Sequence, residues 1–231
     1  MNSFAGKNIL VVGASGAFGA EFCAQLSAAG ASVVGSASSN ESAVRLPENL
    51  SQRLLLDLES DESITVLAGY LLSLPETIDG IVLAAGLVAF GSIADTPIGV
   101  TQRLMEVNAL GQIALVQKLL PKLIESAAAG KEPFVLSISG VISESPMAGL
   151  AFYSASKTAL FGFATAASKE LRKAGINWVD ARPGHTESGL AGRAIFGTAP
   201  NFGAGKDLPS VVSRMIAGLS AGERDLPSSA F

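Results

Sequence analysis

Short apolar runs alternate with helical segments along the chain, and this alternation restricts the possible folds more than any other feature. Six runs have the length and composition of strands, and they cover residues 8–13, 32–36, 54–56, 79–85, 134–138 and 176–181. Helical periodicity covers residues 20–29, 62–73, 98–128, 151–174 and 208–221, whereas residues 40–50 are polar and irregular. Strands that alternate with helices form right-handed βαβ units and a parallel sheet. We therefore predict a doubly wound, Rossmann-type α/β fold with about six strands in the order 3-2-1-4-5-6 and helices on both faces.

Composition agrees with a single such domain over residues 1–231 and excludes several other classes of protein. The chain is 48% hydrophobic with a net charge of −4, so it suits a sheet buried on both faces and offers no basic surface for nucleic acid or an anionic membrane. One cysteine, Cys23, excludes an internal disulfide, and one histidine, His185, argues against a His-based zinc site or a Ser-His-Asp triad. Without a signal peptide or a bilayer-spanning apolar run, we expect a soluble, cytoplasmic protein that binds no metal.

Three glycines lie between the first predicted strand and the first predicted helix. They are Gly13, Gly16 and Gly19, and this position between a strand and a helix raises a glycine motif above chance. Gly13 lets the chain turn, Gly16 lets the backbone approach a pyrophosphate, and the helix N-terminus favours negative charge. The motif predicts a dinucleotide site; the alternative is a tight turn that only tolerates glycine.

The segment after the second predicted strand bears on which dinucleotide binds. An acid there would accept hydrogen bonds from the ribose 2′-hydroxyl of NAD, but residues 35–39 read Gly-Ser-Ala-Ser-Ser. Small hydroxyls such as that of Ser36 do not repel a 2′-phosphate, so we favour NADP(H) over NAD(H), with Arg45 as the nearest cation. Asp57 ends the third strand, where a carboxylate either meets the adenine or caps the next helix.

Tyr153 and Lys157 lie four residues apart in a predicted helix, so their side chains point the same way. A free tyrosine loses its proton near pH ~10, and a neighbouring ammonium stabilises the phenolate and lowers its pKa. The pair predicts a general acid/base. The alternative is two solvated polar residues on a helix face.

Taken together, these residues resemble the short-chain dehydrogenase/reductase family over essentially the whole chain. Further matching pieces are Ala84-Ala85-Gly86 after the fourth strand, Asn108, Ser139 after the fifth and Pro183-Gly184 after the sixth. The resemblance implies an oxidoreductase that moves hydride between a nicotinamide cofactor and a small carbonyl compound or secondary alcohol. Tyr153 would exchange the proton, Lys157 would hold the ribose and lower the pKa of Tyr153, and Asn108 would support a proton path through water.

The resemblance also implies which residues line the cofactor and the substrate. Those lining the cofactor are Gly13, Ser15, Gly16, Phe18, Gly19, Ser36, Asp57, Leu58, Ala85, Gly86, Asn108, Tyr153, Lys157, Pro183, Gly184, Thr186 and Ser188. The chain departs from the family at Ala17, which replaces a loop glycine, and at Gly140, which occupies the position of the catalytic serine. We assign that role to Ser139, with Ser143 as the alternative, and we expect Ser143 and His185 to lie near the substrate.

By the same resemblance, residues 183–207 form a mobile, mostly apolar flap over the substrate. The long helices carrying Asn108 and Tyr153 would pair across a two-fold axis in a homodimer, and no seventh strand is evident that would favour a tetramer. The altered glycine loop and Gly140 leave a second hypothesis open, a dinucleotide-binding sensor or scaffold with little or no catalysis. A third, an epimerase or dehydratase, has little room for a sugar-nucleotide domain.

Overall fold

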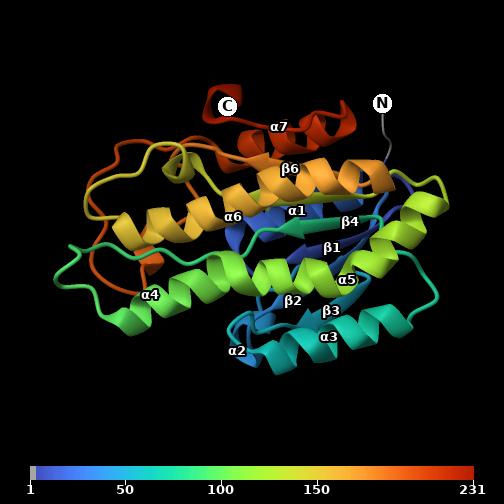
Figure 1. The fold of residues 1–231 in the computed structure, drawn as a ribbon, viewed down its shortest axis with the longest axis horizontal. Coiled ribbons are helices and arrows are strands. Elements are labelled where there is room, and N and C mark those ends of the chain that lie inside the picture. Colours follow the sequence, from blue (N-terminus) through green and yellow to red (C-terminus); the bar gives the residue numbers. More distant parts are fainter. Residues whose placement is uncertain (1–3) are drawn as a thin grey trace.

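A central parallel sheet lies between two layers of helices in the computed structural model, which describes residues 4–231 (Figure 1). Its strands are β1 (Asn8–Val12), β2 (Ser32–Ala37), β3 (Gln52–Leu55), β4 (Gly80–Leu83), β5 (Phe134–Ile138) and β6 (Asn177–Ala181). Their order is β3-β2-β1-β4-β5-β6, and each pair is parallel. The predicted doubly wound fold is therefore confirmed.

Two apolar clusters fasten the helices to the two faces of the sheet. The helices are α1 (Ala17–Ala28), α2 (Asn40–Ala43), α3 (Asp61–Ser73), α4 (Ile98–Met105), α5 (Gly111–Ala128), α6 (Ala151–Leu171) and α7 (Leu208–Ser220). One cluster joins α1 and α7 to the sheet through side chains such as Phe22 and Met215. The other joins α3, α5 and α6 through side chains such as Leu67, Leu119 and Trp178. Short 3-10 turns cover Val141–Ser143, Arg172–Ala174, Ala191–Arg193 and Ser228–Ala230.

The single helix predicted over residues 98–128 is wrong in one respect, because a π-helical turn interrupts it. The α4 helix ends at Met105, the π-helical turn η1 covers Glu106–Leu110, and α5 begins at Gly111. A π-helical turn accommodates one extra residue in a helix and is frequent at functional sites. Here it contains Asn108, one of the predicted site residues.

Residues 40–50 also differ from the prediction, since they include the short helix α2. Its N-cap, Ser39, accepts a hydrogen bond from the backbone N–H of Ser42 at 3.2 Å. A serine in this position satisfies one of the free N–H groups at the start of a helix. The capping serine was present in the sequence, but a four-residue helix is too short to show a period.

The outer edge of β6 is met by the chain end through an isolated bridge between Ala181 and Leu226. Leu226 donates its N–H to the carbonyl of Asp180 at 3.1 Å and accepts from the N–H of Arg182 at 2.9 Å. The guanidinium of Arg182 binds Asp225 through two 2.8 Å hydrogen bonds and also binds Glu144 in the loop after β5. The chain end is therefore tied to the loops at the carboxyl edge of the sheet without a seventh strand in the described residues.

Candidate active site

The glycine loop between β1 and α1 is closely packed where the chain turns. Gly13 has a φ of +81°, and a Cβ there would lie 2.8 Å from the Cα of Ala85. A Cβ on Gly19 would lie 2.2 Å from the carbonyl oxygen of Gly13. Contacts this short exclude a side chain at either position. The two glycines hold the loop, the start of α1 and the segment after β4 together.

The start of α1 is open, in contrast to the turn before it. A Cβ on Gly16 would meet only the carbonyl of Gly13, at 3.4 Å, and no side chain caps the helix. The first turn of α1 also lacks acidic residues. Its free N–H groups and the positive end of the helix dipole therefore fit a pyrophosphate, with Ser15 in the preceding loop and Phe18 in the first turn of α1.

The residues at the ends of β2 and β3 have structural partners. Ser36 is buried, and its hydroxyl accepts a hydrogen bond from the N–H of Gly13 at 3.3 Å, whereas Ser38 and Ser39 are exposed. The carboxylate of Asp57 accepts from the N–H of Glu59 at 2.9 Å, in a turn that leads into α3. Asp57 does not cap α3, because the N-cap is Ser60. Leu58 is buried among core residues against Gly111.

Two predicted residues, Asn108 and Lys157, meet beside Gly86. A Cβ on Gly86 would lie 3.4 Å from both the Oδ1 of Asn108 and the Nζ of Lys157. Asn108 is fully buried, and its amide accepts from the N–H of Leu87 at 2.8 Å and donates to its carbonyl at 2.9 Å. It also donates to the hydroxyl of Ser156 on α6 at 2.9 Å. The π-helical turn thus places Asn108 where it fixes the segment after β4 to the helix that carries Tyr153 and Lys157.

Burial dominates the titration of Tyr153 and Lys157. It raises the pKa of Tyr153 to about 12, and the phenol has no hydrogen-bond partner within residues 4–231. It lowers the pKa of Lys157 to about 8, against the charge of Asp180, which raises it. The expected lowering of the Tyr153 pKa by Lys157 is therefore wrong for this structure. The ammonium of Lys157 instead donates to the carbonyl of Ile138 at 2.8 Å.

One of the two hydroxyls predicted for catalysis, that of Ser139, binds a buried carboxylate that sequence reasoning missed. Asp180 on β6 accepts from the hydroxyl of Ser137 at 2.5 Å and from that of Ser139. Ser143 donates toward the Ser139 oxygen at 3.1 Å and the Gly140 carbonyl at 2.8 Å. Burial raises the pKa of Asp180, against these hydrogen bonds, which lower it. Because Ser139 is directed at Asp180, its role toward a substrate stays a prediction.

A signal for Asp180 was present in the sequence. Asp180 interrupts an otherwise apolar strand, and Ser137 does the same in the neighbouring one. The two residues are opposite each other in the parallel register of β5 and β6. A polar residue at the same level in two adjacent buried strands indicates a hydrogen-bonded pair, because buried polar groups need partners.

An apolar cluster packs against Tyr153. Its buried members are Val88, Phe90, Ile142 and Leu150, and flap residues including Leu190 and Phe202 pack against them. The flap is hydrogen-bonded to the segment after β4, because Phe90 donates to Phe196 and Ile195 donates to Val88, each at 2.9 Å. Residues of the segment 183–207 thus pack with Tyr153 against one apolar cluster. The role of this segment as a mobile substrate flap stays a prediction.

The remaining predicted residues lie in the segment after β6. The ring of His185 lies 5.2 Å from that of Phe202. The hydroxyl of Thr186 donates to the carbonyl of Gly184 at 3.0 Å. The backbone N–H of Ser188 donates to the backbone carbonyl of Thr186 at 2.7 Å. Pro183 accepts from the N–H of Val141 at 2.9 Å, which joins this segment to the loop after β5. The predicted residues thus gather at the carboxyl edge of the sheet, where open α/β sheets bind ligands.

The described residues hold neither a metal-binding cluster nor a membrane-spanning helix. Within residues 4–231 no group of three or more His, Cys, Asp and Glu side chains is placed to hold a metal ion. No helix in the same range is long and apolar enough to cross a membrane. Cys23 is buried with a free thiol, and burial raises its pKa to about 12.

Comparison with known sequences gives one family and several relatives. The family described as short chain dehydrogenase matches residues 7–195. Dehydrogenase/reductase SDR family member 7B of Xenopus tropicalis is 27% identical over 207 residues, which cover 84% of this chain and 66% of the relative. Dehydrogenase/reductase SDR family protein 7-like of Anopheles gambiae is 30% identical over 209 residues, 86% of this chain and 65% of the relative. The chain thus spans just under two thirds of these relatives.

Solved structures share the fold over nearly the whole chain. A short-chain dehydrogenase from Streptomyces avermitilis has a TM-score of 0.83 at 25% identity and covers 98% of this chain and 90% of its own. A 3-ketoacyl-(acyl-carrier-protein) reductase from Brucella melitensis, complexed with NADH, has a TM-score of 0.85 at 22% identity and covers 99% of both chains. A short-chain dehydrogenase from Sphingobium yanoikuyae in complex with NADPH has a TM-score of 0.82 at 20% identity, covering 96% of this chain and 87% of its own.

Proposed function

The chain belongs to the short-chain dehydrogenase family, and on that premise we propose that it is an oxidoreductase acting on a small carbonyl compound or secondary alcohol. The observation that carries the proposal is that Asn108, in the π-helical turn η1, and Lys157, on the helix α6 that also bears Tyr153, both approach Gly86 in the segment after β4. When bound, the nicotinamide supplies or accepts the hydride. The free N–H groups at the start of α1 would hold the pyrophosphate, and Lys157 would donate to the ribose hydroxyls.

Tyr153 is our proposed general acid/base. A phenol with a pKa of about 12 keeps its proton at neutral pH, so it is suited to donate that proton to a carbonyl oxygen. In the opposite direction the phenolate needs a nearby positive charge, which Lys157 would supply by exchanging its contact with Ile138 for one with the cofactor and the phenol. Asn108 would hold the segment after β4 in place throughout.

Ser139 and Ser143 would share the role of the missing serine at position 140. Ser139 is fully buried and bound to Asp180, whereas Ser143 is 8% exposed and lies in the turn after β5. Ser143 is therefore the better placed of the two to contact a substrate oxygen. Ser139 and the carboxylate of Asp180 would orient it, because they fix the direction of the hydroxyl chain.

NADP(H) is our proposed cofactor in preference to NAD(H). Ser38 and Ser39 are exposed at the end of β2, and neither they nor their strand neighbours carry a negative charge that would repel a 2′-phosphate. Structural neighbours bind both kinds of dinucleotide, as their NADH and NADPH complexes indicate. Titration of the protein with NADPH and with NADH tests the preference, and tighter binding of NADH contradicts it.

Residues 1–231 would form one catalytic domain that assembles as a homodimer through α4, α5 and α6. Leu110, Ile124 and Phe163 are exposed apolar side chains on these helices and on η1 between them. Light scattering on purified protein should give the mass of a dimer, and Phe163→Glu should shift it toward the monomer. A wild-type monomer at micromolar concentration contradicts the proposal.

Turnover of NADPH and NADH with a panel of ketones and aldehydes tests the activity. Tyr153→Phe should lower kcat at least about 100-fold, in line with the loss of a general acid, and should leave cofactor binding unchanged. Full activity in Tyr153→Phe contradicts the assigned role.

A second function, a dinucleotide-binding sensor or scaffold, is favoured by Gly140. Its φ of +74° suits glycine, so the missing hydroxyl is not restored by a simple substitution. The sensor hypothesis predicts tight dinucleotide binding without turnover of any carbonyl compound. The same assay therefore separates the two functions.

A further inference from the structure

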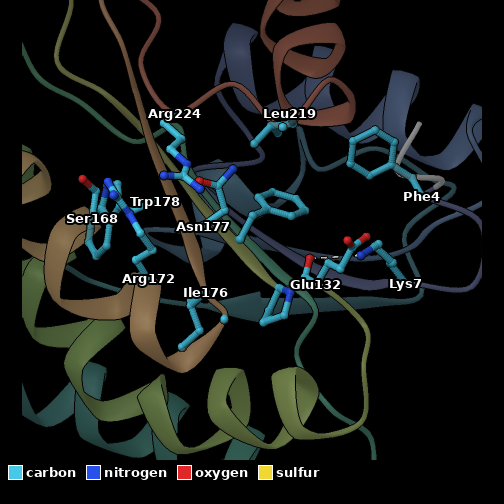
Figure 2. Close-up of a pocket in the computed structure, with 14 residues that line it drawn as sticks. Phe4, Lys7, Glu132, Ser168, Arg172, Ile176, Asn177, Trp178, Leu219 and Arg224 are labelled. Atoms are coloured by element: carbon cyan, nitrogen blue, oxygen red, sulfur yellow. Dashed lines mark hydrogen bonds between the residues drawn. The ribbon is translucent and has the colours of Figure 1, made fainter.

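A cavity lies at the edge of the sheet opposite the candidate active site, where β5 and β6 begin (Figure 2). It has a volume of about 250 Å³ and is lined by the amino-terminal segment, the first residues of β5 and β6, and the segments that follow α6 and α7. None of its lining residues belongs to the predicted site. The proposed oxidoreductase activity therefore does not explain it.

The floor of this cavity is apolar and largely aromatic. Phe4 and Phe134 are buried and pack edge to face, with ring centroids 6.0 Å apart and an interplanar angle of 83°. Trp178, Ile176 and Leu219 are also buried and complete the apolar lining. A flat apolar group would bury its surface against these side chains at little cost, because they are already packed.

The rim of the cavity is cationic. Arg172 and Arg224 are exposed, and within residues 4–231 their guanidinium groups have no carboxylate partner, unlike those of Arg103, Arg182 and Arg214. Figure 2 shows Arg224 above Asn177 and Arg172 beside Trp178. A free guanidinium offers a fork of donors that matches a carboxylate.

A strained turn fixes a third cation at the other end of the cavity. Glu132 has a φ of 51°, the only non-glycine residue among those described with a positive φ, and it precedes Pro133, a position that favours extended backbone. Its carbonyl and that of Lys131 accept hydrogen bonds from the Nζ of Lys7. Three cations and one carboxylate thus line a single cavity in a protein of net charge −4.

We propose that this cavity binds a small organic anion with a flat apolar body, such as an aromatic carboxylate. The carboxylate would lie on the guanidinium of Arg172 or Arg224, and the ring on the floor formed by Phe134 and Trp178. The ligand is small because the volume is below the range of roughly 300–1,000 Å³ that holds drug-sized molecules.

Trp178 reports on binding directly, because it is the only tryptophan of the chain and lines the cavity. Benzoate should produce a saturable change in its fluorescence and in the NMR shift of its indole N–H. Benzyl alcohol, which lacks the charge, and inorganic phosphate, which lacks the ring, should each bind roughly tenfold or more weakly. Saturating NADPH should leave the benzoate response unchanged, which separates this cavity from the active site.

Two double variants test the arginines. Arg172→Gln with Arg224→Gln should weaken benzoate binding at least about tenfold. Arg45→Gln with Arg53→Gln removes the same charge from exposed positions outside the cavity and should leave binding unchanged. Thermal unfolding of both variants checks that they are folded. No saturable response from Trp178, equal binding of benzyl alcohol, or undiminished binding in the first variant would overturn the proposal.

Discussion

The cofactor side and the substrate side of the candidate cleft are constructed by different means. On the cofactor side, Gly13 and Gly19 bring backbone segments within contact of one another, and the start of α1 is left open. On the substrate side, Phe90 and Phe202 fill the space next to Tyr153. Closely packed backbone cannot adjust, whereas side chains of a surface segment can repack. We infer that the cofactor side is preformed and that the substrate side must open to admit a substrate.

The largest effect should come from adding a side chain to the glycine loop on the cofactor side. Gly13→Val should weaken NADPH binding at least about 100-fold, because a Cβ would lie 2.8 Å from Ala85 and a β-branched residue disfavours a positive φ. Calorimetric titration measures this. Gly69→Ala is the control: no atom lies within 4 Å of the new Cβ in α3, so stability should rise by about 0.5–1 kcal/mol. Unchanged binding in Gly13→Val would show that the loop can adjust.

The buried carboxylate of Asp180 should give the next largest effect. Asp180→Asn should lower the free energy of unfolding by about 3 kcal/mol, because two serine hydroxyls and Arg182 lose a buried negative partner. Asp225→Asn removes another partner of Arg182 whose side chain is 59% exposed, and should cost less than about 1 kcal/mol. Urea unfolding compares the two variants. Equal losses of unfolding free energy in the two variants would show that the contacts of Arg182, and not the burial of the Asp180 carboxylate, determine the effect.

The pKa of Lys157 predicts opposite effects of pH on binding and on stability. Above about pH 8 the amine loses its charge, so cofactor affinity should fall a few-fold, and Lys157→Arg should remove this dependence. Between about pH 8 and 10.5 the unfolded chain binds more protons than the folded one, so the contribution of Lys157 to stability should rise with pH. Urea midpoints measured across this window, with Lys157→Met as reference, check the sign. A contribution that falls with pH would contradict the lowered pKa.

The smallest effect should come from removing an aromatic ring from the substrate side. Phe202→Ala removes ring contacts with Phe90 and His185, and should raise amide exchange at Phe90 and Ile195 about tenfold while NADPH affinity stays unchanged. Phe163→Ala, on the far side of α6 against Trp178, is the matched control and should leave exchange in the flap unaltered. Exchange that is equally fast in wild type would show that the flap is already open in solution.

Local patterns were enough to predict the fold, and less so the ends of its elements. A short apolar run indicated each of the six strands, although β3 begins with Gln52 and Arg53 before its predicted start at residue 54, and the order followed from the rules for parallel sheets. The fourth strand was predicted to reach Ala85 but ends at Leu83. Ala84 still donates its N–H to the carbonyl of Val12 at 3.0 Å, and Ala85 then packs against Gly13. These contacts join segments about 70 residues apart, which a local pattern does not contain.

The candidate site was predictable by residue type and less so by contact. Tyr153, Lys157 and Asn108 follow from spacing and resemblance, but the partners of Lys157 and Ser139 depend on how β5, β6 and α6 pack. The pKa of Tyr153 was predicted in the wrong direction for this structure because the degree of burial depends on the flap, which is distant in the sequence. The cavity where β5 and β6 begin was not predicted from the sequence, because its lining comes from five separate parts of the chain.

The π-helical turn at Glu106–Leu110 makes the number of residues between β4 and β5 matter as much as their identity. One residue in an α-helix corresponds to about 100° of rotation. Deleting a residue of this turn other than Asn108 would restore regular winding and rotate Asn108 relative to α5, away from the backbone of Leu87. Substitutions on the exposed side of the turn leave that geometry intact, so in evolution this segment should accept changes of residue far more readily than changes of length.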